Sequence, residues 1–235
     1  MLVPERKFLA LFLFYTVNAF VIPSVFRVGV AFAEAERPIL ILGDSMTKGD
    51  FGRDLHQIIS EETGRETYSI GIGGVGSWDY TRARLINNCC GYSIRRTLPH
   101  GRTETLENSE ALDNRIIGKN FGGNLEGILN ALKPSVILIA LGTNRKNAHV
   151  ALIELIRKQL PETQIIWIGP PILSTSAAIY AGLTVSLSHL TPPVPLIRCD
   201  QMKDMGDPKV TMLHYSGKQA RDFATEVYAE IQKLQ

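Results

Sequence analysis

Two loops contain the residue types that nucleophilic catalysis requires. Ser45 lies in a Gly-Asp-Ser turn (residues 43–47, GDSMT) directly after an apolar run, and His214 precedes the last amphipathic stretch of the chain. A serine hydroxyl is a weak nucleophile until a base such as imidazole accepts its proton. Ser45 and His214 are therefore a candidate nucleophile and base, although each segment by itself also fits an ordinary turn or helix cap.

Two further loops contain groups that can bind an anionic oxygen. Residues 71–77 read GIGGVGS, and residues 142–144 read GTN. Glycine lets a backbone N–H approach an oxyanion closely, and the amide of Asn144 can donate to one. The first loop also matches the GxGxxG pattern of dinucleotide-binding proteins, which belongs after a first strand and needs an acidic residue about 20 positions later. Here the loop follows a second strand, and no acidic residue lies between Asp79 and Glu104, so nucleotide binding is disfavoured.

Short apolar runs alternate with amphipathic stretches along the chain, as in proteins whose parallel strands are joined by helices. The pattern predicts a three-layer α/β/α sandwich around a mainly parallel, five-stranded sheet. In such sheets ligands bind at the carboxyl ends of the strands, where all four loops are expected. The predicted strands are Pro38–Leu42, Thr67–Ile72, Ser135–Leu141, Gln164–Ile168 and Pro195–Cys199, and the predicted helices are Phe51–Glu62, Asn124–Leu132, Val150–Leu160 and Gly217–Leu234.

Residues 87–120 interrupt this alternation. The segment has no clear period and is rich in Arg, Asn, Gly, Thr and Glu. We expect a long insertion there rather than an element of the sheet. Long ordered loops are often functional, and a flexible surface excursion is the alternative.

The first 33 residues have the pattern of a secretory signal. Arg6 and Lys7 precede an uncharged, apolar run over residues 8–26, and Ala31-Phe32-Ala33 supplies a small-residue cleavage site. The run is also about as long as a membrane-spanning helix needs, so an uncleaved anchor is the alternative, and only that alternative implies a membrane partner. Residues 34–235 are then expected to form one secreted or periplasmic domain.

Composition and cysteine usage exclude several classes of protein. The 235 residues include 25 Lys and Arg against 23 Asp and Glu, without a basic stripe, so nucleic acid is not an expected partner. There is no HExxH or CxxC motif, and we expect no metal and no cofactor. For the three cysteines we expect one of two arrangements. Either Cys199 forms a disulfide with Cys89 or Cys90, which are adjacent, or all three cysteines are buried and reduced.

The order and spacing of the four loops resemble the GDSL-type or SGNH hydrolase family, over residues 37–235. The resemblance implies a flavodoxin-like fold and ester hydrolysis through an acyl-serine. It assigns Ser45 as nucleophile, His214 as general base, and Gly74 and Asn144 as oxyanion donors together with the backbone N–H of Ser45. No GxSxG motif occurs, so the nucleophile elbow of the α/β-hydrolases is not supported.

Two positions depart from the family pattern. Arg145 stands where the third block usually has Asp, and Thr211 stands where the last block, Asp-x-x-His, has its catalytic Asp. The carboxylate of a triad orients the imidazole and stabilises its cation. We therefore expect Asp207 or Asp204 in the same loop to replace it, or a Ser-His dyad to act alone, or the domain to bind without catalysing.

The expected function is that of an extracytoplasmic serine esterase that removes O-acetyl or other short acyl groups from a cell-wall or extracellular carbohydrate. Transfer of the acyl group to a glycan and binding of a glycan without catalysis are the alternatives. Trp78 and Tyr80, just beyond the glycine-rich loop, are candidates for stacking on a sugar ring, with buried packing as the alternative. The sequence makes no prediction of oligomeric state.

Overall fold

A computed structural model describes residues 37–85, 90–108, 123–144, 147–171, 176–202 and 214–234 of the protein. The expected signal or anchor segment, residues 1–33, lies outside these ranges. The residues from Arg37 onward form one compact unit. Within the described ranges, no helix is long and apolar enough to cross a membrane.

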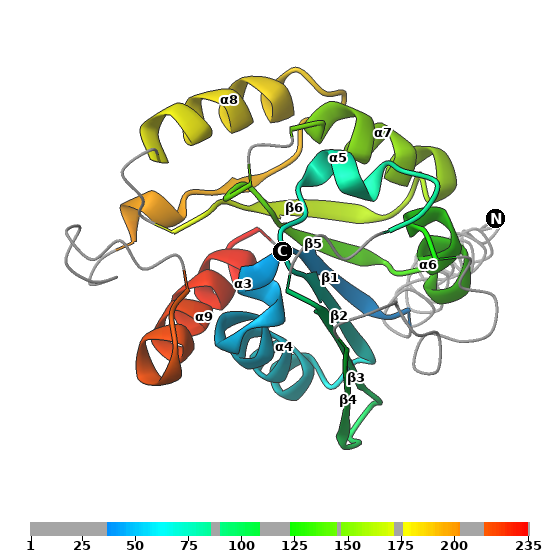
Figure 1. The fold of residues 1–235 in the computed structure, drawn as a ribbon, viewed down its shortest axis with the longest axis vertical. Helices are drawn as coiled ribbons and strands as arrows, with labels where there is room; N and C mark the ends of the chain where they lie inside the picture. Colours follow the sequence, from blue (N-terminus) through cyan, green and yellow to red (C-terminus); the bar gives the residue numbers. More distant parts are fainter. Residues whose placement is uncertain are drawn as a thin grey trace, which may run out of the picture. The chain divides into compact units, whose positions relative to one another are not determined.

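Seven strands within the described residues form one sheet, in the order β4-β3-β2-β1-β5-β6-β7 (Figure 1). Five of them, in the order β2-β1-β5-β6-β7, are parallel, which is the strand order of flavodoxin-like folds. The predicted α/β fold with this topology is therefore confirmed. The strands are β1 Ile39–Gly43, β2 Thr67–Ile72, β3 Tyr92–Thr97, β4 Thr103–Asn108, β5 Val136–Ala140, β6 Gln164–Ile168 and β7 Leu196–Ile197.

The prediction of five strands was wrong, because β3 and β4 add an antiparallel hairpin to one edge of the sheet. These strands lie inside the segment expected to hold no sheet element. β3 places Ser93 and Arg95 in the interior instead of apolar side chains, and β4 leaves Thr103–Thr105 exposed at the sheet edge. Neither strand therefore forms the continuous apolar run by which buried parallel strands are found in a sequence.

Helices cover both faces of the sheet, and the side chains of β1 alternate between the two cores. Ile39 and Ile41 pack with α4 and α9, whereas Leu40 and Leu42 pack with α6, α7 and α8. Figure 1 shows α4 and α9 on one side of the sheet and α7 and α8 on the other. The helices are α3 Ser45–Lys48, α4 Asp50–Thr63, α5 Ser77–Tyr80, α6 Leu125–Leu132, α7 His149–Gln159, α8 Ser176–Ser188 and α9 Gly217–Gln232.

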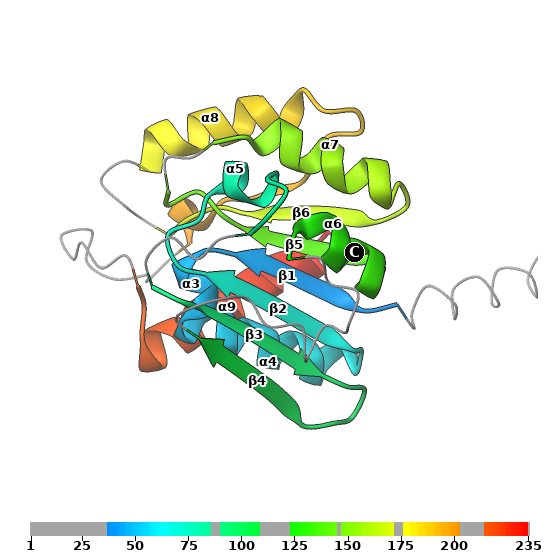
Figure 2. The ribbon, with the colours of Figure 1, turned by 45° about the vertical axis from the view of Figure 1, so that its right-hand side comes forward.

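The register of the central strands aligns the loops that follow them. Gly43 at the end of β1 pairs with Gly71 in β2 and with Ala140 in β5. The Gly-Asp-Ser turn, the glycine-rich turn and the Gly-Thr-Asn turn therefore leave the sheet at one edge. Figure 2 shows α3 and α5 at the end toward which the arrows of β1 and β2 point.

The disulfide state of the cysteines matches neither of the two expected arrangements. Cys199 is free and buried, and Cys90 is disulfide-bonded. Cys199 is therefore not the partner of an adjacent cysteine, and the three cysteines are not all reduced. Burial also raises the pKa of the Cys199 thiol above its ordinary value, so this thiol is protonated and packs as an apolar side chain.

Candidate active site

The turn after β1 presents Ser45 at the start of the short helix α3. Asp44 caps this helix, because its Oδ1 accepts a hydrogen bond from the Met46 N–H at 2.9 Å. Helix α3 lies directly on the neighbouring strand, since a Cβ on Gly71 would come within 2.1 Å of the Lys48 nitrogen. The missing side chain at this position therefore fixes how closely the serine-bearing helix approaches the sheet.

His214 lies beside Ser45, although 169 residues separate them in the chain. The His214 Nε2 atom is 2.8 Å from the Ser45 Oγ atom. Helix α9 starts three residues later, and its first N–H, from Gly217, donates to Asp50 Oδ2 at 2.9 Å. This contact ties the loop before α9 to α4. A neutral His214 with Nε2 unprotonated can thus accept the hydroxyl proton of Ser45.

Asn144 joins the nucleophile turn to the glycine-rich turn. Its Nδ2 donates to the Val75 carbonyl at 2.8 Å and makes a longer contact, 3.3 Å, with Asp44 Oδ2. Gly74 precedes Val75 and has a φ of 73°, which places it in the left-handed region that glycine favours. The predicted oxyanion donors Gly74 and Asn144 therefore belong to two turns that are in direct contact.

Asp44 is a buried carboxylate at the centre of this arrangement. Its Oδ2 accepts a 2.5 Å hydrogen bond from the Thr143 hydroxyl. Burial raises the pKa of Asp44, while the bonds from Thr143 and Met46 and the attraction to His214 act in the opposite direction. Burial is the larger effect, so the pKa of Asp44 lies above its ordinary value. We did not predict the electrostatic interaction between Asp44 and His214 from the sequence, in which Asp44 was interpreted only as part of a turn.

Trp78 and Tyr80, the two aromatic residues of α5, differ in exposure. Tyr80 is fully buried, and its hydroxyl donates to the Gly43 carbonyl at 2.8 Å. It holds α5 against the end of β1 and is not available to a ligand. Trp78 is 48% exposed, so of the two candidates for sugar stacking only Trp78 is accessible.

The sequence also gave no sign that Arg95 supports the helix of the nucleophile. This residue of β3 is 4% exposed and donates to the carbonyls of Thr47 at 2.9 Å and Lys48 at 2.6 Å. Burial lowers the pKa of the guanidinium, and its ion-pair partner, the exposed Glu107, is 4.0 Å away. The charge is therefore compensated mainly by the backbone carbonyls at the end of α3.

We expect Arg95→Met to lower the free energy of unfolding by about 3 kcal/mol, because it leaves these buried carbonyls without donors. Arg96→Met is the matched control, since Arg96 neighbours Arg95 but forms a partly exposed ion pair with Glu66 at 2.8 Å. Its loss should cost about 1 kcal/mol or less. Urea denaturation measures both values, and equal losses for the two variants would contradict the support of α3 by Arg95.

Several predicted positions lie outside the described residues, namely Arg145, Asp204, Asp207 and Thr211. A third member of a catalytic triad therefore stays a prediction. In the part of the chain that the structure describes, no group of three or more His, Cys, Asp or Glu side chains is arranged to hold a metal ion.

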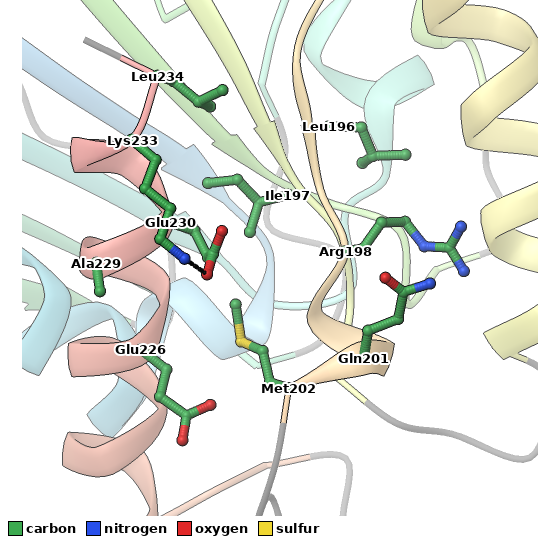
Figure 3. Close-up of a pocket in the computed structure, with 10 residues that line it drawn as sticks. All are labelled: Leu196, Ile197, Arg198, Gln201, Met202, Glu226, Ala229, Glu230, Lys233 and Leu234. Carbon is green, nitrogen blue, oxygen red and sulfur yellow. Dashed lines mark hydrogen bonds and ion pairs between the residues drawn. The ribbon is translucent and has the colours of Figure 1, made fainter.

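Two cavities differ in their relation to the candidate active site. A small one, about 10 Å³, is lined by Asp44 and Met46, which flank Ser45, and by the mostly apolar residues Phe51, Ala140, Leu141, Thr143, Ile168, Gly169, Pro170, Pro171 and Phe223. A larger cleft of about 620 Å³ lies between α9 and the segment after β7 (Figure 3). Neither Ser45 nor His214 lines this cleft, and its Glu230 is paired with Lys233 at 2.5 Å.

No protein-family model matches the chain, and no curated protein matches it. Among solved structures, the chain is similar to a family two carbohydrate esterase from Clostridium thermocellum in complex with cellohexaose, with 16% identity and a TM-score of 0.47 over 84% of this chain and 64% of that chain. It is also similar to the acetyl xylan esterase Est2A from Butyrivibrio proteoclasticus, with 14% identity and a TM-score of 0.44 over 84% of this chain and 63% of that one. The chain thus spans less than two thirds of either esterase.

A third similar structure is the lipopolysaccharide acetyltransferase periplasmic domain from Salmonella ser. Paratyphi A, with 11% identity and a TM-score of 0.35 over 70% of this chain and 66% of that chain. Five parallel strands in the order β2-β1-β5-β6-β7, with Ser45 directly after the central β1, give the chain the flavodoxin-like α/β fold.

Proposed function

We propose that the protein is an extracytoplasmic serine esterase that removes acetyl or other short acyl groups from a carbohydrate. The observation that carries the proposal is the 2.8 Å distance between Ser45 Oγ and His214 Nε2. Such a pair activates a serine for acyl transfer, which neither residue achieves alone. The signal-like pattern of residues 1–33 supports the location outside the cytoplasm.

In the first step, Ser45 Oγ attacks the ester carbonyl while its proton passes to His214 Nε2. The negative charge that develops on the carbonyl oxygen is stabilised by the N–H groups of Ser45 and Gly74 and by the Asn144 amide. For the amide to donate, its long contact with Asp44 gives way while the 2.8 Å bond to Val75 holds it in place. The sugar hydroxyl then leaves with the proton from His214.

In the second step, His214 takes a proton from water, and the hydroxide attacks the acyl carbon. The bond between this carbon and Ser45 Oγ then breaks, His214 returns the proton to Ser45 Oγ, and the carboxylic acid is released. The cationic form of His214 occurs in both steps. The ionised form of Asp44 and this cation attract each other, while burial of Asp44 acts against its ionisation. We assign Asp207 as a third member that orients the imidazole through a hydrogen bond.

The small cavity supports a short acyl group, because Asp44 and Met46, the chain neighbours of Ser45, line it, although Ser45 itself does not. The volume of this cavity is about 10 Å³, close to the minimum that holds one water-sized group. A methyl group is of this size, whereas a longer chain would need Met46 or Phe223 to move. Close packing makes such movements unfavourable.

The proposal is tested with the full chain, p-nitrophenyl acetate and acetylated xylan as substrates, and a fluorophosphonate probe that labels activated serines. We expect release of acetate from both esters and labelling of Ser45. Retention of the polysaccharide without labelling would instead support a binding module. Acetylation of an added oligosaccharide, with little free acetate, would identify a transferase.

We expect Asp207→Asn to lower kcat for p-nitrophenyl acetate by about 10³-fold to 10⁴-fold. The amide keeps the shape of the carboxylate, but it does not stabilise the imidazolium that forms in both steps. Asp204→Asn, in the same loop, is the matched control and should retain the wild-type rate. A loss in Asp204→Asn instead of Asp207→Asn would assign the third position to Asp204, and wild-type rates in both variants would show that Ser45 and His214 act as a dyad.

A further inference from the structure

Helix α5 and the turn after it present an aromatic ring and two arginines that the proposed reaction does not use. Trp78 is 48% exposed, and the Arg82 guanidinium carbon lies 4.8 Å from the centre of its ring. Arg84, two residues further along, is also exposed. Neither arginine forms an ion pair with any residue of the described ranges. We call Trp78, Arg82 and Arg84 the α5 patch.

The backbone beneath the α5 patch is held firmly. The Thr81 hydroxyl donates to the Trp78 carbonyl at 2.7 Å, and the Leu85 N–H donates to the Gly123 carbonyl at 2.7 Å. The Asn124 amide donates to the Ala83 carbonyl at 3.2 Å. The patch is therefore displayed from a fixed turn, and the ring of Trp78 in turn holds the Arg82 guanidinium through a cation–π contact.

The α5 patch is close to the candidate active site. Trp78 follows Gly74 by four residues, so their Cα atoms are separated by about 14 Å or less. Tyr80, from the same helix turn, reaches the Gly43 carbonyl at 2.8 Å, two residues before Ser45. A polysaccharide with an esterified sugar at Ser45 would therefore bring a neighbouring sugar of the chain to the patch.

The chemistry of the patch indicates which sugar it binds. The half-exposed indole of Trp78 offers an apolar surface on which a pyranose ring packs. The Arg82 guanidinium lies over the same ring and offers planar donors that match a carboxylate in a bidentate arrangement. Asp79, the acidic residue within the same segment, is buried and accepts a hydrogen bond from the Gly76 N–H at 2.9 Å, so it does not compete for the arginines.

We propose that the α5 patch is a subsite for an acidic sugar, a uronic acid residue adjacent to the esterified sugar of the substrate. This inference rests on the proposed function and narrows its substrate to acidic polysaccharides. The part of the indole that Arg82 leaves exposed packs against the sugar ring, Arg82 binds the carboxylate, and Arg84 adds positive charge.

The test compares two acetylated oligosaccharides of equal length, an acidic oligogalacturonide and a neutral xylo-oligosaccharide. We expect the wild type to prefer the acidic substrate, and Arg82→Gln to lower the ratio of the two kcat/KM values about 10-fold. Trp78→Ala should lower kcat/KM for both oligosaccharides relative to p-nitrophenyl acetate. Arg102→Gln, an exposed arginine in the turn between β3 and β4, is the matched control and should leave the ratio unchanged.

A separate measurement keeps this inference independent of the hydrolytic reaction. Calorimetric titration of the full chain with unesterified oligogalacturonide should give binding that weakens with salt and weakens about 10-fold in Arg82→Gln. Equal affinity of the wild type and Arg82→Gln for this ligand would overturn the subsite. Acid-sugar binding by a wild type that hydrolyses no ester would overturn the proposed esterase activity but retain the subsite.

Discussion

Ser45→Ala should lower kcat for p-nitrophenyl acetate by about 10⁴-fold or more, because it removes the atom that forms the acyl bond. The oxyanion donors remain, so the residual rate reflects water attacking the bound ester. Labelling by the fluorophosphonate probe should be lost completely. Nitrophenol release and probe labelling of the purified protein measure the two effects.

The effect of Ser45→Ala is separable from unfolding. Ser45 is half-buried, and its hydroxyl contacts the exposed side chain of His214, so the substitution should change the free energy of unfolding by less than about 1 kcal/mol. Ser60→Ala is the matched control, because Ser60 is a buried serine whose hydroxyl donates within α4 to the Gln57 carbonyl. Ester hydrolysis at the wild-type rate in Ser45→Ala would contradict the mechanism.

Periodicity was sufficient to predict the parallel part of the sheet. The predicted bounds Thr67–Ile72 and Gln164–Ile168 agree with those of β2 and β6. Both strands are buried along almost their whole length. In β6 every residue after Gln164 is apolar, so the run is visible without any partner, whereas β2 also contains Thr67 and Ser69 and is marked by the glycines that follow it.

Elements without an apolar run or a helical period were missed. Helix α8 contains no charged residue, and its exposed side carries mostly Ala, Gly and Val beside Thr184 and Ser188. This composition weakens the contrast between the two sides that identifies an amphipathic helix. In the β3–β4 hairpin, the interior position of Arg95 depends on carbonyls of α3, almost 50 residues earlier in the chain. Such a contact leaves no trace in local spacing.

The candidate active site was predictable to the level of its loops, but not of its contacts. The carboxyl ends of parallel strands meet at one edge, and this rule brings Ser45, Gly74 and Asn144 together. By contrast, the contact of Asp44 with Thr143 spans 99 residues, and the sequence does not specify that this carboxylate lies buried near His214. The position of Asp207 remains a prediction for the same reason, because it depends on how its loop folds.

His214→Ala should lower kcat for p-nitrophenyl acetate by about 10⁴-fold, since Ser45 then has no base to accept its proton. His214 is exposed, so its removal should leave the protein folded. His189→Ala, at an exposed position after α8, is the matched control and should retain the wild-type rate. Nitrophenol release measures the loss, and a wild-type rate in His214→Ala would assign the base to another residue.

The double variant Ser45→Ala/His214→Ala determines whether the two residues act as one unit. Because the imidazole serves only to move the proton of Ser45 and of the water that follows, its removal has nothing further to impair once the hydroxyl is absent. We therefore expect the double variant to hydrolyse the ester at the rate of Ser45→Ala. Losses that multiply would mean that His214 acts on the substrate independently of Ser45, and that their 2.8 Å contact is not the catalytic one.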